Sequence, residues 1–318
     1  MVIDIVSVFC RRDYFMQLLQ ARSIAKYFNR KSLGQLIYIW HDTEEMPLEI
    51  NQILESELYG ISYKLLTASE FGIDRKNIGI DGWTTQQALK LLASKCVKTE
   101  NYLVLDAKNH FVACCGAEDF IAKDGRGLFP FVDLKLNESY KYALEYFGLD
   151  LRSNNYCMRG VLNITPFLLR KEIVEKLIIS FKEHDACSTV ETFIRHQHKI
   201  SEFLSYQAFV VSQGYRISDL YDEFVYTKIS ETIWGHIASQ EREFINLMQN
   251  AYNEKIKVLG LHWIACSIMT NNQKTRLCIY WMNIGLCDTL LDGHEVIESV
   301  AKNLSHNDIR YLNNFLGF

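Results

Sequence analysis

The stretch YLVLDAKNHFV, residues 102–112, combines an apolar run with the aspartate Asp106 and the cation Lys108. Residues 102–105 are apolar and include the aromatic and branched side chains that favour strands, and the run stops at Asp106. In an open α/β sheet, ligands bind beyond the carboxyl ends of the strands, so Asp106 is expected at such a site. The alternative from spacing alone is an aspartate that caps the turn after a buried strand.

Segments before this stretch alternate between strand and helix patterns. The apolar run VIDIVSVF at 2–9 is typical of a buried first strand, and residues 12–28 then show helical spacing. The same patterns predict further strands at 36–40 and 61–66 and further helices at 48–58 and 84–98. Four strands that alternate with three helices favour an α/β fold with an open, mostly parallel sheet flanked by helices.

The second half of the chain has a less regular pattern. It contains no linker-like composition shift, internal repeat or low-complexity tract, so a continuous α/β domain over 1–265 with a helical C-terminal extension over 266–318 packed on it is the simplest organisation. The predicted strands are 129–136, 158–163, 208–212 and 256–268, and the predicted helices are 166–183, 189–204, 237–254 and 287–304.

Composition limits the classes of partner. The formal charge of -4 offers no basic face for duplex nucleic acid, so nucleic acid is not expected as a partner. Asp4, Arg11 and Arg12 interrupt the N-terminal apolar run and the nine cysteines include no CxxC pair, which together indicate a cytoplasmic protein with free thiols. No apolar stretch reaches the roughly 18 residues that a bilayer span needs, which leaves peripheral association with the inner face of the membrane open.

The loop after the first strand lacks a glycine-rich phosphate motif. Its sequence FCRRDYF contains neither GxGxxG nor GxxxxGK followed by Ser or Thr, which argues against dinucleotide oxidoreductases and P-loop kinases. Arg11, Arg12 and Asp13 are instead candidates to contact a nucleotide base, ribose or phosphate. A solvated turn with a helix cap explains the same residues equally well.

Five segments together resemble a known group of proteins. They are VSVFCRRDYF at 6–15, GWTTQQALKL at 82–91, YLVLDAKNHFV at 102–112, ISEFLSYQAFV at 200–210 and VLGLHW at 258–263. The combination is similar to an uncharacterised family of bacterial glycosyltransferase-like proteins that is associated with capsule and lipopolysaccharide gene sets and has the GT-A nucleotide-sugar fold. The resemblance covers residues 1–265 and implies that they form a GT-A-like, Rossmann-like catalytic domain that binds a nucleotide sugar.

The resemblance also implies roles for the turn after the motif strand. Asp106 takes the place of the first aspartate of the GT-A DxD motif, and Lys108 stands where the second would be. Because a protonated lysine cannot ligate a metal, Mn²⁺ or Mg²⁺ on Asp106 and His262 and metal-independent activity both stay open. His262 resembles the late histidine that completes the metal shell or touches the donor diphosphate, and a strand-end histidine bonded to the backbone is its alternative.

Further site residues are implied on two helices. Glu202 matches the region where such enzymes place an acidic residue facing the acceptor, and a carboxylate there could deprotonate an acceptor hydroxyl. Without the resemblance, Glu202 is a solvated helical residue. Gln86 and Lys90 lie one helical turn apart and share a face that either points to the donor pocket or is a polar outer face. The implied site comprises the catalytic residues Glu202, Asp106 and Lys108, the donor-binding residues Arg11, Arg12, Asp13, Gln86, Lys90, Asn109 and His262, and the metal ligands Asp106 and His262.

The expected function follows from this resemblance. It is a glycosyltransferase that moves a hexosyl or related sugar from a nucleotide-sugar donor to a hydroxyl of a glycan acceptor, a bacterial capsule or lipopolysaccharide. The missing second aspartate favours the alternative, a non-catalytic GT-A-like subunit that binds a nucleotide sugar or glycan within a biosynthetic complex. The aromatic tail, with Trp234, Trp263, Tyr280 and Trp281, indicates core packing or a self-association surface, so a homodimer is one expectation.

Overall fold

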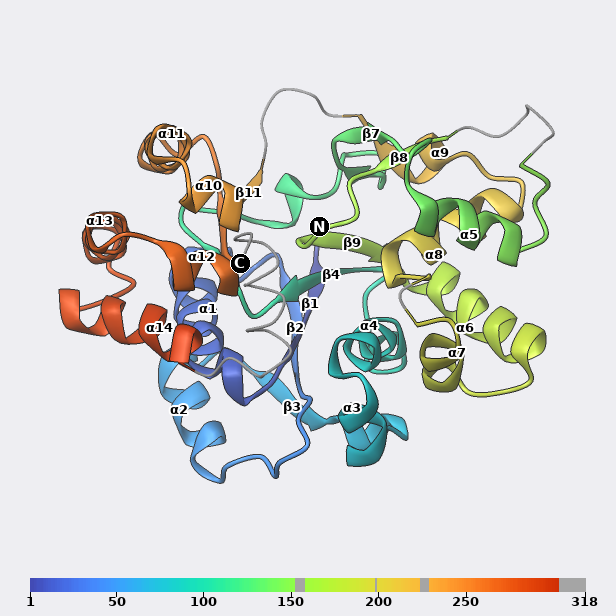
Figure 1. Ribbon diagram of the computed structural model, residues 1–318, viewed down its shortest axis with the longest axis horizontal. Coiled ribbons are helices and arrows are strands. Elements are labelled where there is room, and N and C mark those ends of the chain that lie inside the picture. The colour runs from blue at the N-terminus through green and yellow to red at the C-terminus, as the bar shows by residue number, and fades with distance from the viewer. Residues whose placement is uncertain (152–157, 198, 224–228, 303–318) are drawn as a thin grey trace.

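A five-stranded sheet forms the centre of the computed structural model, which describes residues 1–151, 158–197, 199–223 and 229–302 (Figure 1). Its strands are β1 (Ile3–Phe9), β2 (Leu33–Trp40), β3 (Tyr63–Thr67), β4 (Asn101–Asp106) and β9 (Phe167–Arg170). Their order across the sheet is β3-β2-β1-β4-β9. The first four strands run parallel and β9 runs antiparallel to β4, so the predicted α/β class with a mostly parallel sheet is confirmed.

Helices cover both faces of this sheet. The helices α1 (Tyr14–Tyr27) and α2 (Glu49–Leu58) lie on one side, and α3 (Arg75–Ile80) and α4 (Gly82–Leu92) lie on the other (Figure 1). All seven residues of β1 are buried, as expected for a parallel strand that is covered on both faces. The alternation of strands and helices predicted for residues 2–105 is therefore confirmed, with α3 as an additional short helix.

A second sheet brings a late part of the chain beside the motif turn. It consists of β11 (Ser230–Ile233), β12 (Val258–Leu261) and β5 (Asn109–Phe111), in which β12 runs parallel to β11 and antiparallel to β5. The backbone N–H of Leu261 donates to the carbonyl of Lys108 at 3.1 Å, and that of His262 donates to the carbonyl of Ile233 at 3.1 Å. The carboxyl ends of β11 and β12 therefore lie next to Lys108.

Several predictions for the second half of the chain were wrong. The strand predicted at 208–212 is part of the helix α8 (Glu202–Ser212), which is buried almost all round and so lacks the one-sided period that marks a surface helix. The helix predicted at 166–183 begins only after β9, as α6 (Lys171–Asp185). The helix predicted at 189–204 is divided into α7 (Thr189–Arg195) and the first turn of α8.

The strand predicted at 256–268 ends early. After β12 the chain turns at His262 into the helix α12 (Trp263–Ile268). The sequence pattern also did not predict α13 (Asn271–Asn283), whereas the last predicted helix is present as α14 (Leu290–Lys302). The remaining elements are α5 (Glu138–Tyr146), α9 (Ile217–Leu220), α10 (Gly235–Ala238), α11 (Glu241–Tyr252), β6 (Gly127–Leu128), β7 (Phe131–Asp133), β8 (Arg159–Val161), β10 (Tyr221–Asp222), and the 3-10 turns Arg11–Asp13, Ala68–Phe71, Ala93–Lys95 and Ala117–Asp119.

The described part of the C-terminal extension packs against α1 and the strand β5. Arg22 of α1 donates from Nη1 to the carbonyl of Leu286 at 2.6 Å, and Trp281 of α13 donates from Nε1 to Nε2 of His110 at 2.9 Å. One apolar core runs from Ile3 to Val300 and so includes residues on both sides of position 265. Residues 303–318 of the predicted extension lie outside the described residues.

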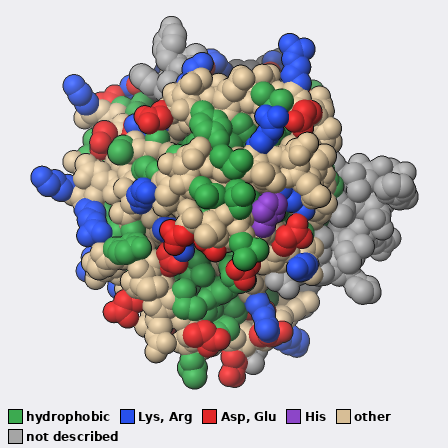
Figure 2. Space-filling model, turned by 90° about the vertical axis from the view of Figure 1, so that its left-hand side faces the viewer, with side chains coloured by type: hydrophobic (Ala, Val, Ile, Leu, Met, Phe, Trp, Pro, Cys, Tyr) green, Lys and Arg blue, Asp and Glu red, His purple; other side chains and the backbone are tan. Residues whose placement is uncertain are grey.

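The aromatic residues of the tail do not form a common surface. Tyr280 and Trp281 are fully buried, so these two belong to the core. Figure 2 views the side of the molecule that carries α13 and α14, and there apolar side chains are interspersed with acidic and basic ones. A homodimer remains a prediction. Within the described ranges, every helix is too short or too polar to span a bilayer.

Candidate functional site

The carboxyl ends of the parallel strands meet at one edge of the central sheet. The backbone N–H of Arg11, just after β1, donates to the Asp42 carboxylate after β2 at 2.8 Å. Gln86 of α4 donates from Nε2 to the carbonyl of Val8 at 3.2 Å, which fixes the start of α4 to the end of β1. The motif turn after β4 lies at this same edge, where open α/β sheets bind their ligands.

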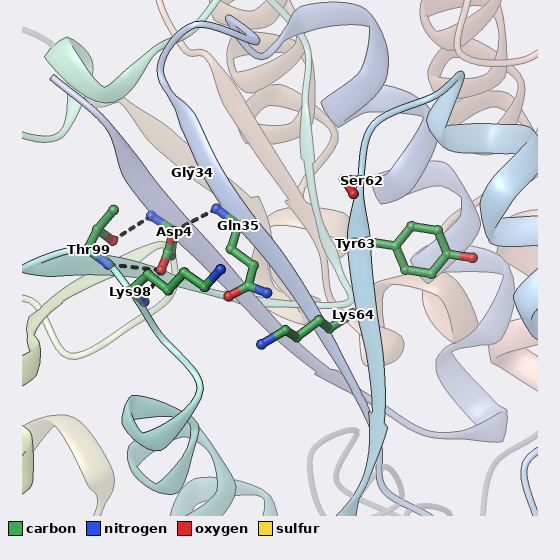
Figure 3. Close-up of a pocket in the computed structure, with 8 residues that line it drawn as sticks. All are labelled: Asp4, Gly34, Gln35, Ser62, Tyr63, Lys64, Lys98 and Thr99. Carbon is green, nitrogen blue, oxygen red and sulfur yellow. Dashed lines mark hydrogen bonds between the residues drawn. The ribbon is translucent and has the colours of Figure 1, made fainter.

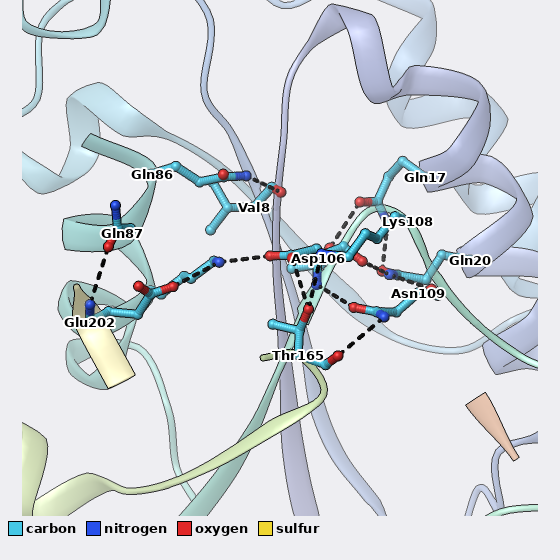
Figure 4. Close-up of polar contacts among 12 residues, drawn as sticks. Val8, Gln17, Gln20, Gln86, Gln87, Asp106, Lys108, Asn109, Thr165 and Glu202 are labelled. Atoms are coloured by element: carbon cyan, nitrogen blue, oxygen red, sulfur yellow. Dashed lines mark hydrogen bonds and ion pairs between the residues drawn. The ribbon is translucent and has the colours of Figure 1, made fainter. Parts of the chain in front are cut away.

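Asp106, the last residue of β4, holds cations on both of its carboxylate oxygens. Its Oδ2 pairs with Lys108 and accepts from the Thr165 hydroxyl at 2.7 Å (Figure 4). Its Oδ1 lies 2.7 Å from the Lys90 ammonium. Burial alone would raise the pKa of the Asp106 carboxyl, but the ammonium groups of Lys108 and Lys90 outweigh burial and hold that pKa well below its usual range. Asp106 is therefore an ionised carboxylate at neutral pH.

Lys90 connects Asp106 to Glu202 across the interior. Its ammonium lies 2.7 Å from Asp106 Oδ1 and 3.0 Å from Glu202 Oε1, although Lys90 and Glu202 are 112 residues apart in sequence. The Lys90 side chain is only 6 % exposed and that of Glu202 only 7 % exposed. Burial opposes the charge of Lys90 most strongly, but the carboxylates Asp106 and Glu202 together raise its pKa above the usual value. We call Lys90, Asp106, Lys108 and Glu202 the charge cluster.

Lys108 is the lysine of the cluster that reaches towards solvent. Its side chain is 19 % exposed, and besides Asp106 its ammonium lies 3.4 Å from Thr165 Oγ1 and 5.7 Å from the centre of the Trp234 ring. The Trp234 ring in turn packs against the His262 ring, with centroids 4.7 Å apart. A carboxylate, a hydroxyl and an aromatic face thus hold the ammonium of Lys108 in one place.

Buried amides fix the backbone of the motif turn. Asn109 accepts on Oδ1 from the backbone N–H of Asp106 at 2.9 Å. Gln20 of α1 donates from Nε2 to the carbonyls of Asp106 and Asn109, at 2.7 and 2.8 Å, and accepts from Gln17 (Figure 4). Asn109 was predicted to bind the donor; the structure places it fully buried beneath the turn, where it holds Asp106 and Lys108 in position.

Arg11, Arg12 and Asp13, in the turn after β1, contact residues close to them at this edge of the sheet. Arg11, whose side chain is 65 % exposed, pairs with Glu44 on the loop after β2. Arg12 lies 3.5 Å from the Asp13 carboxylate, which also accepts from the Cys10 thiol at 3.3 Å. These residues stand at the same sheet edge as the charge cluster, while the contact of Arg11 directs its guanidinium to Glu44.

His262 begins α12 as its N-cap residue. Its Nδ1 accepts from the backbone N–H of Ile264 at 3.3 Å, and its ring packs between Trp234 and Trp263, with ring centroids 4.7 and 5.4 Å away. His262 therefore stands beside Trp234 at the rim of the site, with one ring nitrogen engaged in the helix cap.

The donor set around Asp106 does not fit a divalent cation. Its carboxylate oxygens already face two ammonium groups, whereas Mn²⁺ and Mg²⁺ require several oxygen or nitrogen ligands that carry no positive charge. Among the described residues, the structure assembles no group of three or more His, Cys, Asp and Glu side chains with the geometry of a metal site. The chemistry available at this point is that of fixed ammonium groups.

A hollow at the opposite edge of the sheet has a different character. It encloses about 460 Å³ near the starts of the strands and is lined by Asp4, Gly34, Gln35, Ser62, Tyr63, Lys64, Lys98 and Thr99 (Figure 3). The buried Asp4 carboxylate accepts from the backbone N–H groups of Gln35 at 2.6 Å, Lys98 at 2.5 Å and Thr99 at 3.1 Å. These bonds tie strand ends together, and this edge is not where open α/β sheets bind ligands.

Sequence reasoning missed three residues of the site. Thr165 donates to Asp106, Trp234 packs over Lys108, and Gln87 accepts on Oε1 from the backbone N–H of Glu202 at 3.3 Å. Thr165 and Trp234 follow no local motif, because tertiary packing alone brings them to the turn. Only Gln87 carried a signal, since it adjoins the predicted pair Gln86 and Lys90.

Comparisons with solved structures give low identities. The WbbM bifunctional glycosyltransferase has a TM-score of 0.45 and 10% identity over 81% of this chain, which spans 45% of the length of that protein. The galactosyltransferase LgtC has a TM-score of 0.45 and 12% identity over 98% of this chain and 100% of its own. The glycosyltransferase GlyE of Streptococcus pneumoniae has a TM-score of 0.43 and 11% identity over 94% of this chain and 64% of its own. No curated protein matches the sequence.

One family model spans most of the sequence. It matches residues 13–295, which include the motif turn, all four residues of the charge cluster, and Trp234 with His262. This chain belongs to that family, DUF6492, a family of unknown function.

Proposed function

We propose that this protein is a glycosyltransferase that moves a sugar from a nucleotide-activated donor to a hydroxyl of a bacterial surface glycan, a capsule or lipopolysaccharide. The observation that carries the proposal is the charge cluster at the carboxyl end of β4, where Asp106 holds the partly exposed Lys108 ammonium. The open, mostly parallel sheet and the absence of a glycine-rich phosphate loop after β1 support a nucleotide-sugar site rather than a dinucleotide or P-loop site.

The proposed reaction requires two chemical functions from this site. The phosphate that leaves with the nucleotide must be neutralised, and the acceptor hydroxyl must lose its proton as it attacks the sugar. We assign the first task to Lys108, held by Asp106, and the second to Glu202. Arg11, Arg12 and Asp13 stand at the same edge and are proposed to contact the nucleotide, with residues 1–265 as the domain that binds it.

A second candidate function is a non-catalytic subunit that binds a nucleotide sugar. The burial of Glu202 favours it, because a base that is 7 % exposed and already paired with Lys90 is poorly placed to reach an acceptor hydroxyl. Under this alternative Glu202 only supports Lys90 and so positions Asp106.

The two functions are separated by binding and turnover measured on one preparation. Calorimetry with a panel of UDP-, GDP- and CMP-sugars identifies the donor, and release of free nucleotide with and without glycan acceptor reports transfer and hydrolysis. Binding with turnover that falls at least tenfold in Glu202→Gln, but not in the exposed control Glu172→Gln, supports the transferase. Binding without turnover supports the subunit, and no binding of any nucleotide sugar contradicts both functions.

A further inference from the structure

The cations that neutralise the Asp106 carboxylate are lysine ammonium groups. Each carboxylate oxygen faces an ammonium group, Lys90 on Oδ1 and Lys108 on Oδ2, and the Thr165 hydroxyl completes the set. A divalent ion brought to this carboxylate would lie beside two fixed positive charges and would have to displace one of them. The positive charge that faces the ligand is therefore already built into the chain.

The two lysines differ in what they can reach. The Lys90 side chain is 6 % exposed, and its ammonium forms ion pairs with Asp106 and Glu202 inside the protein. Lys108 is held against Asp106, Thr165 and the Trp234 ring but remains partly exposed, and an ammonium has three protons to donate. Lys108 can thus keep its contact with Asp106 and donate to an anionic oxygen on its open side.

We propose that the site binds the diphosphate of its nucleotide donor on the Lys108 ammonium, in the place of a divalent cation, so that binding needs no metal. This inference rests on the proposed function, because it takes a nucleoside diphosphate as the ligand. Asp106, Thr165 and Trp234 then act as positioning residues that fix Lys108 before the ligand arrives, which reduces the ordering cost of binding.

Calorimetry with UDP, GDP, CDP and ADP tests the inference on the full chain, first in EDTA and then with Mn²⁺. We expect one of these diphosphates to bind with the same affinity in both conditions. Lys108→Met should weaken that binding about 10- to 100-fold, as expected for the loss of a charge-assisted hydrogen bond, and Lys108→Arg should restore most of it. The matched control is Lys176→Met, on the exposed face of α6, which should bind like the wild type.

The outcomes distinguish this inference from the proposed function. Binding that appears only with Mn²⁺ overturns the inference and leaves the proposed function standing. Binding in EDTA that Lys108→Met does not weaken also overturns it, provided that thermal unfolding shows the variant to be folded. Absence of binding in both conditions overturns the proposed function and the inference with it. A titration of Mn²⁺ alone into the wild type and into Asp106→Asn gives a check without nucleotide. If the wild type binds Mn²⁺ and Asp106→Asn abolishes this binding, the inference that lysines take the place of the metal is contradicted.

Discussion

Replacement of Lys90 by Met should destabilise the protein by about 3–5 kcal/mol, the usual cost of removing one partner from a buried ion pair. Lys90 is 6 % exposed and neutralises two carboxylates at 2.7 and 3.0 Å. Asp106 would keep Lys108, whereas among the described residues the structure places no cation other than Lys90 against the buried Glu202. Methionine retains most of the apolar stem of the side chain, so the loss measures the charge of the ammonium, including its contact with the Phe203 ring, whose centre lies 5.4 Å away.

Urea unfolding at neutral pH is the assay, with two further variants. Lys176→Met, on an exposed lysine of α6, should cost less than about 0.5 kcal/mol. Lys90→Met combined with Glu202→Gln should recover about 1–3 kcal/mol, because the orphaned charge is gone. A loss in Lys90→Met no larger than that of the control, or a double variant as unstable as the single one, would refute the reasoning.

The pH dependence of the same difference gives a second check. The lowered pKa of Asp106 means that its contribution is complete above the unfolded value near 4 and is lost as pH falls towards the folded value. The raised pKa of Lys90 means that its contribution is complete below about 10.4 and is lost as pH rises through the folded value. The part of the cost of Lys90→Met that comes from the Lys90–Asp106 pair should therefore be constant from about pH 5 to pH 9.

Three further predictions concern neighbouring residues. Burial lowers the pKa of His110 to about 4, so below about pH 6.5 the unfolded chain binds the proton first and stability falls by up to about 3 kcal/mol on the way to pH 4. His110→Gln should reduce this acid loss in urea unfolding at pH 7 and pH 4.5, and an unchanged loss would contradict a buried neutral imidazole. Thr165→Val removes the hydroxyl that donates to Asp106 at 2.7 Å and should cost about 1 kcal/mol of stability together with a several-fold loss of nucleotide affinity in calorimetry; unchanged affinity would show that Lys108 needs no such support. Lys108→Asp puts a second carboxylate in the turn and should bind Mn²⁺ more tightly than the wild type in spin-resonance titrations; equal retention by the two proteins would contradict the view that the ammonium occupies the cation position.

Local sequence patterns predicted the first half of the fold and failed in parts of the second. The run at 2–9 is short and mostly apolar, with only Asp4 and Ser7 as polar residues, which is typical of a parallel strand covered on both faces, and β1 is buried along its whole length. The run at 208–212 has a similar composition but lies inside the buried helix α8. A short apolar run does not distinguish the two, because a helix that is buried all round loses its period.

Local sequence patterns likewise identified only part of the candidate site. Asp106 and Lys108 are two residues apart, and their place after a predicted strand was enough to single them out. The pairing of Lys90 with Glu202 spans 112 residues and depends on how α4 and α8 pack, which no local pattern encodes. Glu202 was named on resemblance as an acceptor-facing base, and its burial against Lys90 became visible only in three dimensions.

The motif turn also links two sheets of the molecule. Asp106 ends a strand of the five-stranded sheet, and Asn109 begins a strand of the three-stranded sheet, so Ala107 and Lys108 form the direct covalent joint between the two sheets. Lys108, the residue proposed to contact the ligand, therefore lies on a two-residue link between the sheets whose backbone Gln20 and Asn109 hold by hydrogen bonds. The same turn thus sets both the position of the Lys108 side chain and the way in which one sheet joins the other.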